Sequence, residues 1–82
     1  MSGRMATATD RFFEAFDQLV ELGRLSRNKF CIDTGTDRRN FGKQKEDHSR
    51  RIIHAEWLSY LVTEHKVSAD WLLTGRGWMF GE

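Results

Sequence analysis

Residues able to do covalent or metal chemistry are few and scattered in this 82-residue chain. The histidines are His48, His54 and His65; their spacing fits no metal-ligand motif, and no paired carboxylates accompany them. The single cysteine, Cys31, lies at a position that should pack, where a thiol is usually inert. The sequence has no glycine-rich phosphate loop and no catalytic set of residues. We therefore expect no metal, no cofactor and no enzymatic activity.

The chemistry that the sequence does offer is non-covalent binding of a polyanion. Between residues 24 and 51, nine basic residues stand against four acidic ones, in a chain whose total charge is only +1. A segment that carries all the positive excess is the electrostatic footprint expected for a polyanionic partner. On charge alone, a solvated basic surface without a partner is an equal alternative.

Five short helices are predicted to position these side chains, and no segment has a strand pattern. Apolar residues at helical spacing, from Phe12 to Val20, predict a first helix over about 10–22. Thr9 or Asp10 can cap this helix, and Gly23 is placed to end it. Residues 1–8 are predicted to form a flexible arm and residues 9–82 a single domain.

The next two helices flank a glycine-containing turn. Ser26 is a good N-cap, with Leu25 and Phe30 spaced as a hydrophobic staple, and Gly35 should end this second helix. Asp37 can cap a third helix, in which Phe41 is the one large apolar residue. A helix anchored so sparsely is expected to offer its polar, basic side to a partner.

Two more helices and an aromatic tail complete the chain. A fourth helix is predicted over 54–65, with Trp57, Leu58, Leu61 and Val62 on one face. A fifth should run from a cap at Ser68 to Gly75, with Trp71, Leu72 and Leu73 inside. Trp78, Met79 and Phe80 should fold back onto the first and fifth helices; otherwise they form a partner surface.

Two passages together resemble one family. They are Arg27 to Gln44 (RNKFCIDTGTDRRNFGKQ), aligned on Cys31, Gly35, Thr36 and Phe41, and Val67 to Gly75 (VSADWLLTG). In this order they resemble the lambdoid phage-repressor and Cro (XRE-type) DNA-binding domains. The resemblance implies an all-α, compact five-helix phage-repressor-like bundle containing a helix-turn-helix. Thr34 and Gln44 depart from the aliphatic residues usual in the family, and Gly42 lies inside the third helix.

The resemblance also implies roles for the basic side chains. The first exposed residues of the third helix, and one a turn later, would read bases in the major groove. The start of the second helix and the residues after the third would contact phosphates. The implied base-reading residues are Arg38, Arg39, Lys43 and Asn40, and the implied phosphate contacts are Arg27, Asn28, Lys45, Arg50 and Arg51.

The expected function is therefore sequence-specific binding of double-stranded DNA by a repressor-like transcriptional regulator. It would act as a homodimer on a two-fold operator, joined through the fifth helix and the tail with Trp78 and Phe80. The chain lacks an apolar run long enough to span a membrane, and we expect it in the cytoplasm, on the nucleoid. The alternative is a degenerate helix-turn-helix module that binds another protein without recognising DNA.

Overall fold

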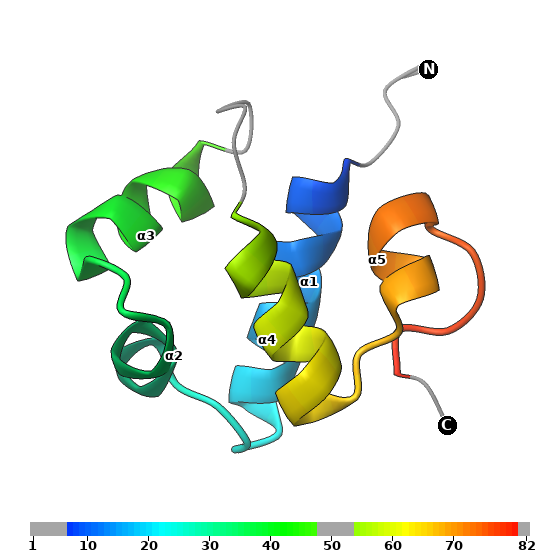
Figure 1. Cartoon of the computed structure of the whole chain (residues 1–82), viewed down its shortest axis with the longest axis horizontal. Coiled ribbons are helices and arrows are strands. Elements are labelled where there is room, and N and C mark those ends of the chain that lie inside the picture. Colours follow the sequence, from blue (N-terminus) through cyan, green and yellow to red (C-terminus); the bar gives the residue numbers. More distant parts are fainter. Residues whose placement is uncertain (1–6, 48–53, 81–82) are drawn as a thin grey trace.

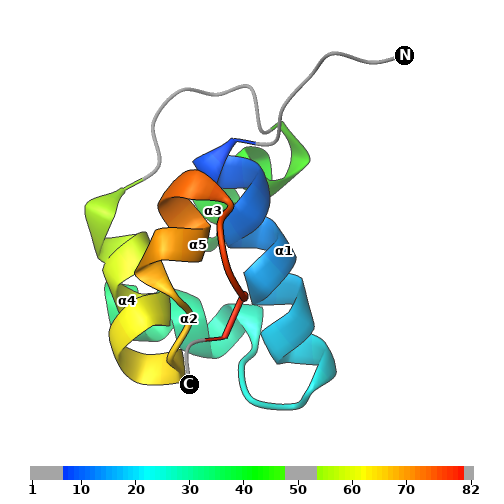
Figure 2. The same ribbon diagram turned by 90° about the vertical axis from the view of Figure 1, so that its right-hand side faces the viewer.

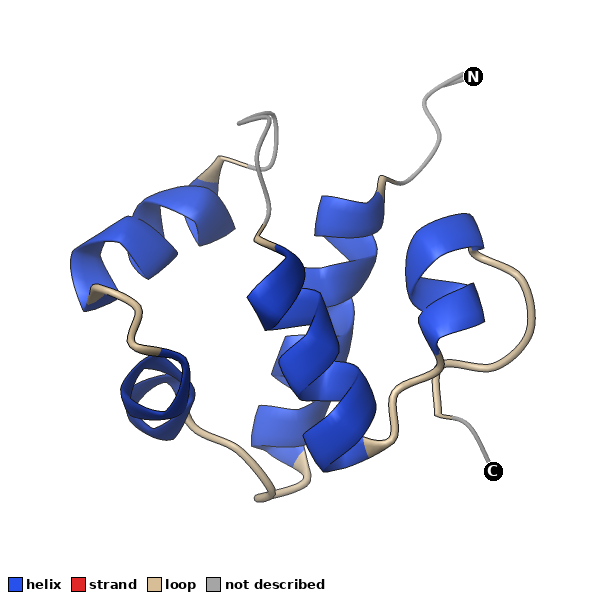
Figure 3. Ribbon diagram, in the orientation of Figure 1, coloured by secondary structure: helices blue, strands red, loops and turns tan. Residues whose placement is uncertain are grey.

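The computed structural model describes residues 7–47 and 54–80, and within these ranges the fold is all-α with five helices and no strand. The helices are α1 (Ala8–Glu21), α2 (Arg27–Thr34), α3 (Arg38–Glu46), α4 (Ala55–His65) and α5 (Ala69–Thr74). α2 and α3 lie on one side of α1 and α4, and α5 lies on the other side (Figures 1 and 3). Between Val67 and Phe80 there is one isolated antiparallel β-bridge.

The first helix begins earlier than the sequence predicted. Its N-cap is Thr7, whose hydroxyl accepts a hydrogen bond from the Asp10 backbone N–H at 3.1 Å, while the Asp10 carboxylate accepts one from the Thr7 N–H at 2.9 Å. This reciprocal capping box satisfies two otherwise orphaned donors. The prediction that Thr9 or Asp10 caps the helix was wrong, since Thr9 is buried inside the first turn and Asp10 is its N3 residue.

The starts of α2, α3 and α5 and the ends of α2 and α5 confirm the expected capping chemistry. The side chains of Ser26, Asp37 and Ser68 cap α2, α3 and α5. Gly35 and Gly75 end α2 and α5 in the left-handed conformation, with φ of 71° and 83°, where a residue with Cβ would be strained. The turn between α2 and α3 is thereby fixed to residues 35–37.

An aromatic cluster fills the core where the helices converge. The ring of Phe12, at 0% exposure, lies within 6.3 Å of four other aromatic rings, those of Phe13, Phe16, Phe30 and Trp57. Such offset and edge-to-face pairs add about 0.5–1.5 kcal/mol each beyond the burial of their area. The cluster joins α1, α2 and α4, and α3 packs against it.

Two apolar side chains that were expected to face the core are instead exposed. Val20 on α1 and Leu73 on α5 have exposed fractions of 42% and 59%. The prediction that Leu73 lies inside α5 was therefore wrong, since in a six-residue helix only Leu72 faces the core fully.

The C-terminal tail divides between the two expected alternatives. It turns back along the start of α5 (Figure 2), where the Ser68 N–H donates to the Met79 carbonyl at 2.8 Å. Met79 and Phe80 pack half-buried against the core. Trp78 points away and is 85% exposed. Folding back is thus correct for two of the three residues and wrong for Trp78.

A single arginine ties α5 to α1. The Arg11 guanidinium donates from Nε to the Leu72 carbonyl at 2.8 Å and from Nη2 to the Leu73 carbonyl at 3.1 Å. These carbonyls belong to the last turn of α5, where they lack partners within the helix and where positive charge complements the helix dipole.

Replacing Arg11 with Met should lower the free energy of unfolding by about 1–3 kcal/mol, because both charge-assisted hydrogen bonds are lost while the aliphatic stem is kept. Urea denaturation followed by circular dichroism measures the change. The matched control is Arg24→Met, since the exposed Arg24 side chain forms no hydrogen bond with a described residue. Equal losses in both variants would show that Arg11 does not hold α5.

Candidate nucleic-acid interface

The position of α3 is set by one buried side chain. Phe41 has 0% exposure, and its ring lies 5.0 Å from Phe16, 5.2 Å from Phe30 and 5.4 Å from Trp57. Gln44, one turn later, is the other buried residue of the helix. These two residues define the inner side of α3, as the sequence predicted for Phe41.

The outer side of α3 is basic. At 3.6 residues per turn, Arg39 and Lys43 lie opposite Phe41 and Gln44, with Arg38 on the flank. All three basic residues are exposed, and no ion pair joins any of them to another described residue. The helix therefore presents cationic side chains to solvent, while its buried side holds the backbone against the core.

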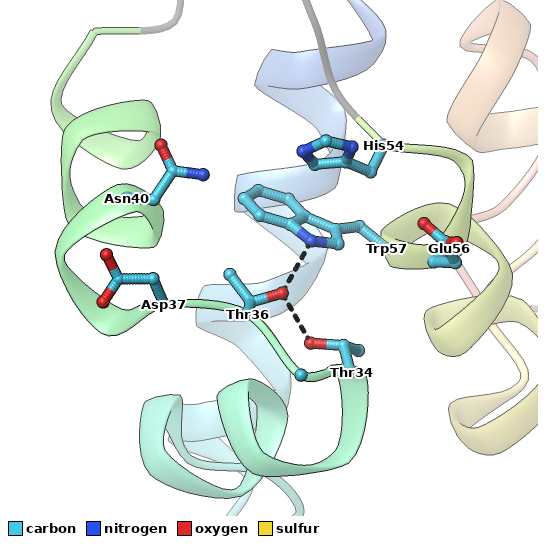
Figure 4. Close-up of a pocket in the computed structure, with 8 residues that line it drawn as sticks. Thr34, Thr36, Asp37, Asn40, His54, Glu56 and Trp57 are labelled. Carbon is cyan, nitrogen blue, oxygen red and sulfur yellow. Dashed lines mark hydrogen bonds between the residues drawn. The ribbon is translucent and has the colours of Figure 1, made fainter.

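Asn40 does not share this outer side. It is half-buried and lines a polar pocket of about 230 Å³ between α3 and the start of α4. Its amide is directed toward His54 and Trp57 (Figure 4). This placement separates Asn40 from the side chains that the sequence grouped with it.

Two threonine hydroxyls, one at the end of α2 and one in the turn, connect the turn to the core through hydrogen bonds. The Trp57 indole Nε1–H donates to the Thr36 hydroxyl at 3.0 Å, and the Thr36 and Thr34 hydroxyls lie 2.8 Å apart (Figure 4). Thr34 donates its own proton to the Phe30 carbonyl at 2.8 Å, so Thr36 must donate to Thr34. The result is a chain of three hydrogen bonds that runs from the Trp57 indole N–H to the Phe30 carbonyl.

Sequence reasoning missed this chain, although two signals were present. Thr34 stands where an aliphatic residue is usual in the family that the sequence resembles, and a buried tryptophan needs an acceptor for its N–H. Trp57 is 2% exposed, and in the described structure its acceptor is the turn itself.

Arg27, at the start of α2, lies across α3. Its guanidinium carbon is 5.5 Å from the centre of the Phe41 ring, a cation–π distance, and Arg27 remains exposed. Asn28 is also exposed in this first turn, after the Ser26 cap. A Cβ added at Gly42 would meet Arg27 Nη1 at 3.9 Å, an ordinary contact, so packing within the domain does not require glycine there.

Lys45 forms a contact within the domain. Its Nζ lies 2.8 Å from an Asp17 carboxylate oxygen and 5.6 Å from the centre of the Phe13 ring. The side chain that the sequence assigned to a phosphate thus ties the end of α3 to α1. Arg50 and Arg51, assigned the same role, lie outside the described residues, as does His48.

A polar contact also joins α2 to α4. The Tyr60 hydroxyl donates to the Asp33 carboxylate at 2.7 Å, and Lys29 pairs with the same oxygen at 3.0 Å. The hydrogen bond from Tyr60, then that from Lys29, lowers the pKa of Asp33. Burial, followed by the bond to Asp33, raises the pKa of Tyr60, so its hydroxyl stays a donor.

The residues considered for metal or nucleophilic chemistry lie apart. No group of three or more His, Cys, Asp or Glu residues within 7–47 and 54–80 could hold a metal ion. His54 precedes α4, and His65 ends it, where burial lowers its pKa. Cys31 is 4% exposed, and desolvation raises the pKa of its thiol, which disfavours the nucleophilic thiolate.

Comparison with protein-family models, curated proteins and solved structures found no match to this chain. The class that the geometry defines is a five-helix, all-α domain with one cationic helix side. Among the described helices, none combines the length and apolar character needed to cross a bilayer.

Replacing Thr36 with Val should lower the free energy of unfolding by about 1–3 kcal/mol, because the isosteric side chain leaves the buried Trp57 N–H without an acceptor. For a domain of this size, each kcal/mol corresponds to roughly 4–8 °C in Tm, which thermal unfolding resolves. Thr63→Val is the matched control, since the exposed Thr63 hydroxyl bonds only to the carbonyl of Ser59 within α4. If both variants unfold at the same temperature, the hydroxyl chain does not stabilise the turn.

Proposed function

We propose that this domain binds double-stranded DNA as a helix-turn-helix regulator, with α2 and α3 as the motif and α3 in the major groove. The observation that carries the proposal is the division of α3 into two sides. Phe41 holds the inner side in the core, and Arg39 and Lys43 project from the outer side without an ion-pair partner among the described residues. Such a helix can present long cationic side chains to base edges without sacrificing its packing.

Base recognition falls to Arg38, Arg39 and Lys43 in this proposal. Arginine pairs with guanine O6 and N7 in a two-point contact worth about 1–3 kcal/mol of discrimination. Arg27 and Asn28, exposed at the start of α2, would contact the phosphate backbone beside the groove, where the helix N-terminus favours an anion.

An apolar groove supports the proposal of a homodimer. It lies between α4 and α5, has a volume of about 300 Å³, and is lined by Leu58, Val62, Leu72 and Leu73 together with small residues. Leu73 is 59% exposed, and burying it against a second copy would remove apolar surface from water. Two copies related by a two-fold axis would present two α3 helices to an operator, and the complex would act by occupancy on the nucleoid.

A second candidate function is protein binding without DNA recognition. The 85% exposure of Trp78 favours it, because exposed tryptophan is enriched where proteins meet. The two functions differ in their dependence on salt. Each phosphate contact releases counterions, so DNA binding weakens steeply with ionic strength, whereas an interface built on Trp78 does not.

Selection from a random duplex library at two salt concentrations tests the proposed function. We expect an enriched site with a G·C pair, and Arg38→Ala or Arg39→Ala should cost about 1–3 kcal/mol and relax the preference at that base pair alone. Arg27→Ala is the comparison variant. It should weaken binding to all duplexes alike and make the salt slope shallower by about one unit. A wild-type protein that enriches no sequence at either salt concentration contradicts the proposal.

Gly42 gives an independent test in which stability and binding change in opposite directions. Gly42→Ala should stabilise the free domain by up to about 1 kcal/mol, because the helix gains propensity and the added Cβ has room. The same methyl group would hold the α3 backbone away from the groove, so DNA affinity should fall. Thermal unfolding and fluorescence anisotropy with the selected duplex measure the two effects. Stabilisation without loss of affinity would rule out a close approach of the backbone at Gly42.

A further inference from the structure

The outer side of α3 carries one acidic residue among its basic ones. Glu46 lies seven residues after Arg39 and three after Lys43, so the three side chains fall within about 60° of arc on the helix. That arc is opposite the buried Phe41 and Gln44. Glu46 is exposed, and it forms neither an ion pair nor a side-chain hydrogen bond with another described residue.

Two local effects disfavour an acid at this position. Glu46 is the last residue of α3, where the negative end of the helix dipole repels a carboxylate. It also lies on the same side of α3 as Arg39 and Lys43, whose charges attract phosphate, and it would weaken that attraction. Lys45 does not neutralise it, because the Lys45 ammonium pairs with Asp17 on α1. A residue that breaks local rules without compensation in the fold is a candidate for a functional role.

We propose that Glu46 is a further specificity-determining residue, whose carboxylate accepts a hydrogen bond from the N4 amino group of a cytosine. This inference rests on the proposed binding of DNA by α3. Cytosine is the base whose major-groove edge offers only a donor, whereas guanine offers only acceptors. A carboxylate at the base edges therefore attracts cytosine and repels guanine O6 and N7, which gives discrimination by both contact and repulsion.

The geometry of α3 also sets where that cytosine lies. Seven residues at 1.5 Å each separate Arg39 from Glu46 by about 10 Å along the helix axis. With α3 lying along the groove, this equals about three base pairs at 3.4 Å per step. The selected half-site should thus contain a G·C pair read by Arg39 and, about three base pairs away, a cytosine read by Glu46.

Selection with the wild type, Glu46→Ala and Glu46→Gln tests the inference, with Glu64→Ala as the matched control. Glu64 is exposed on the last turn of α4, so its loss removes one negative charge from another helix end. We expect Glu46→Ala to abolish the preference for cytosine, a loss of about 5- to 150-fold in discrimination, while binding to unrelated duplexes tightens. Glu46→Gln should shift the preference to adenine, because an amide both donates and accepts at adenine N7 and N6. Glu64→Ala should alter neither preference.

The outcomes separate the inference from the function on which it rests. If Glu46→Ala tightens binding to all duplexes equally and keeps the wild-type preference at every position, Glu46 only repels phosphate and the inference is overturned. If the wild type itself has no sequence preference, the proposed function fails first. Thermal unfolding of each variant verifies that the exposed substitutions leave the fold intact.

Discussion

The burial of Phe41 against Trp57 is the constraint on which the rest of the structure depends. Phe41 is the one large apolar side chain of α3, and it packs where α1, α2 and α4 converge. Because the same indole also donates a hydrogen bond to Thr36, one side chain fixes both the body of α3 and the turn that precedes it. The polar side of α3 can therefore vary without loosening its attachment.

Some basic side chains make contacts within the domain, and others do not. Arg11 bonds to the last turn of α5, Lys45 joins α3 to α1, and Lys29 supports the link between α2 and α4. Arg38 and Arg39 lack such ion-pair partners within the described structure. The basic segment seen in the sequence is thus partly structural, and only a portion of it is displayed on the outer side of α3.

Local chemistry was sufficient to predict most helix ends but not the directions of individual side chains. Ser26, Asp37 and Gly35 act through bonds to near neighbours in the chain, and their roles were correct. Thr7 was missed because its capping box uses an aspartate in place of the usual glutamate. The inward turn of Asn40 depends on contacts from α4, which helical spacing within one short segment does not contain.

The hydrogen bond between Trp57 and Thr36 has a consequence for how sequences of this fold diverge. An aliphatic residue at position 36 would leave the indole N–H without an acceptor, whereas phenylalanine at position 57 would make the hydroxyl unnecessary. The two positions, 21 residues apart, are therefore expected to change together in descendants of this chain. If position 36 or position 57 changes and the other does not, we expect the turn of that descendant to be joined to the core by a different contact.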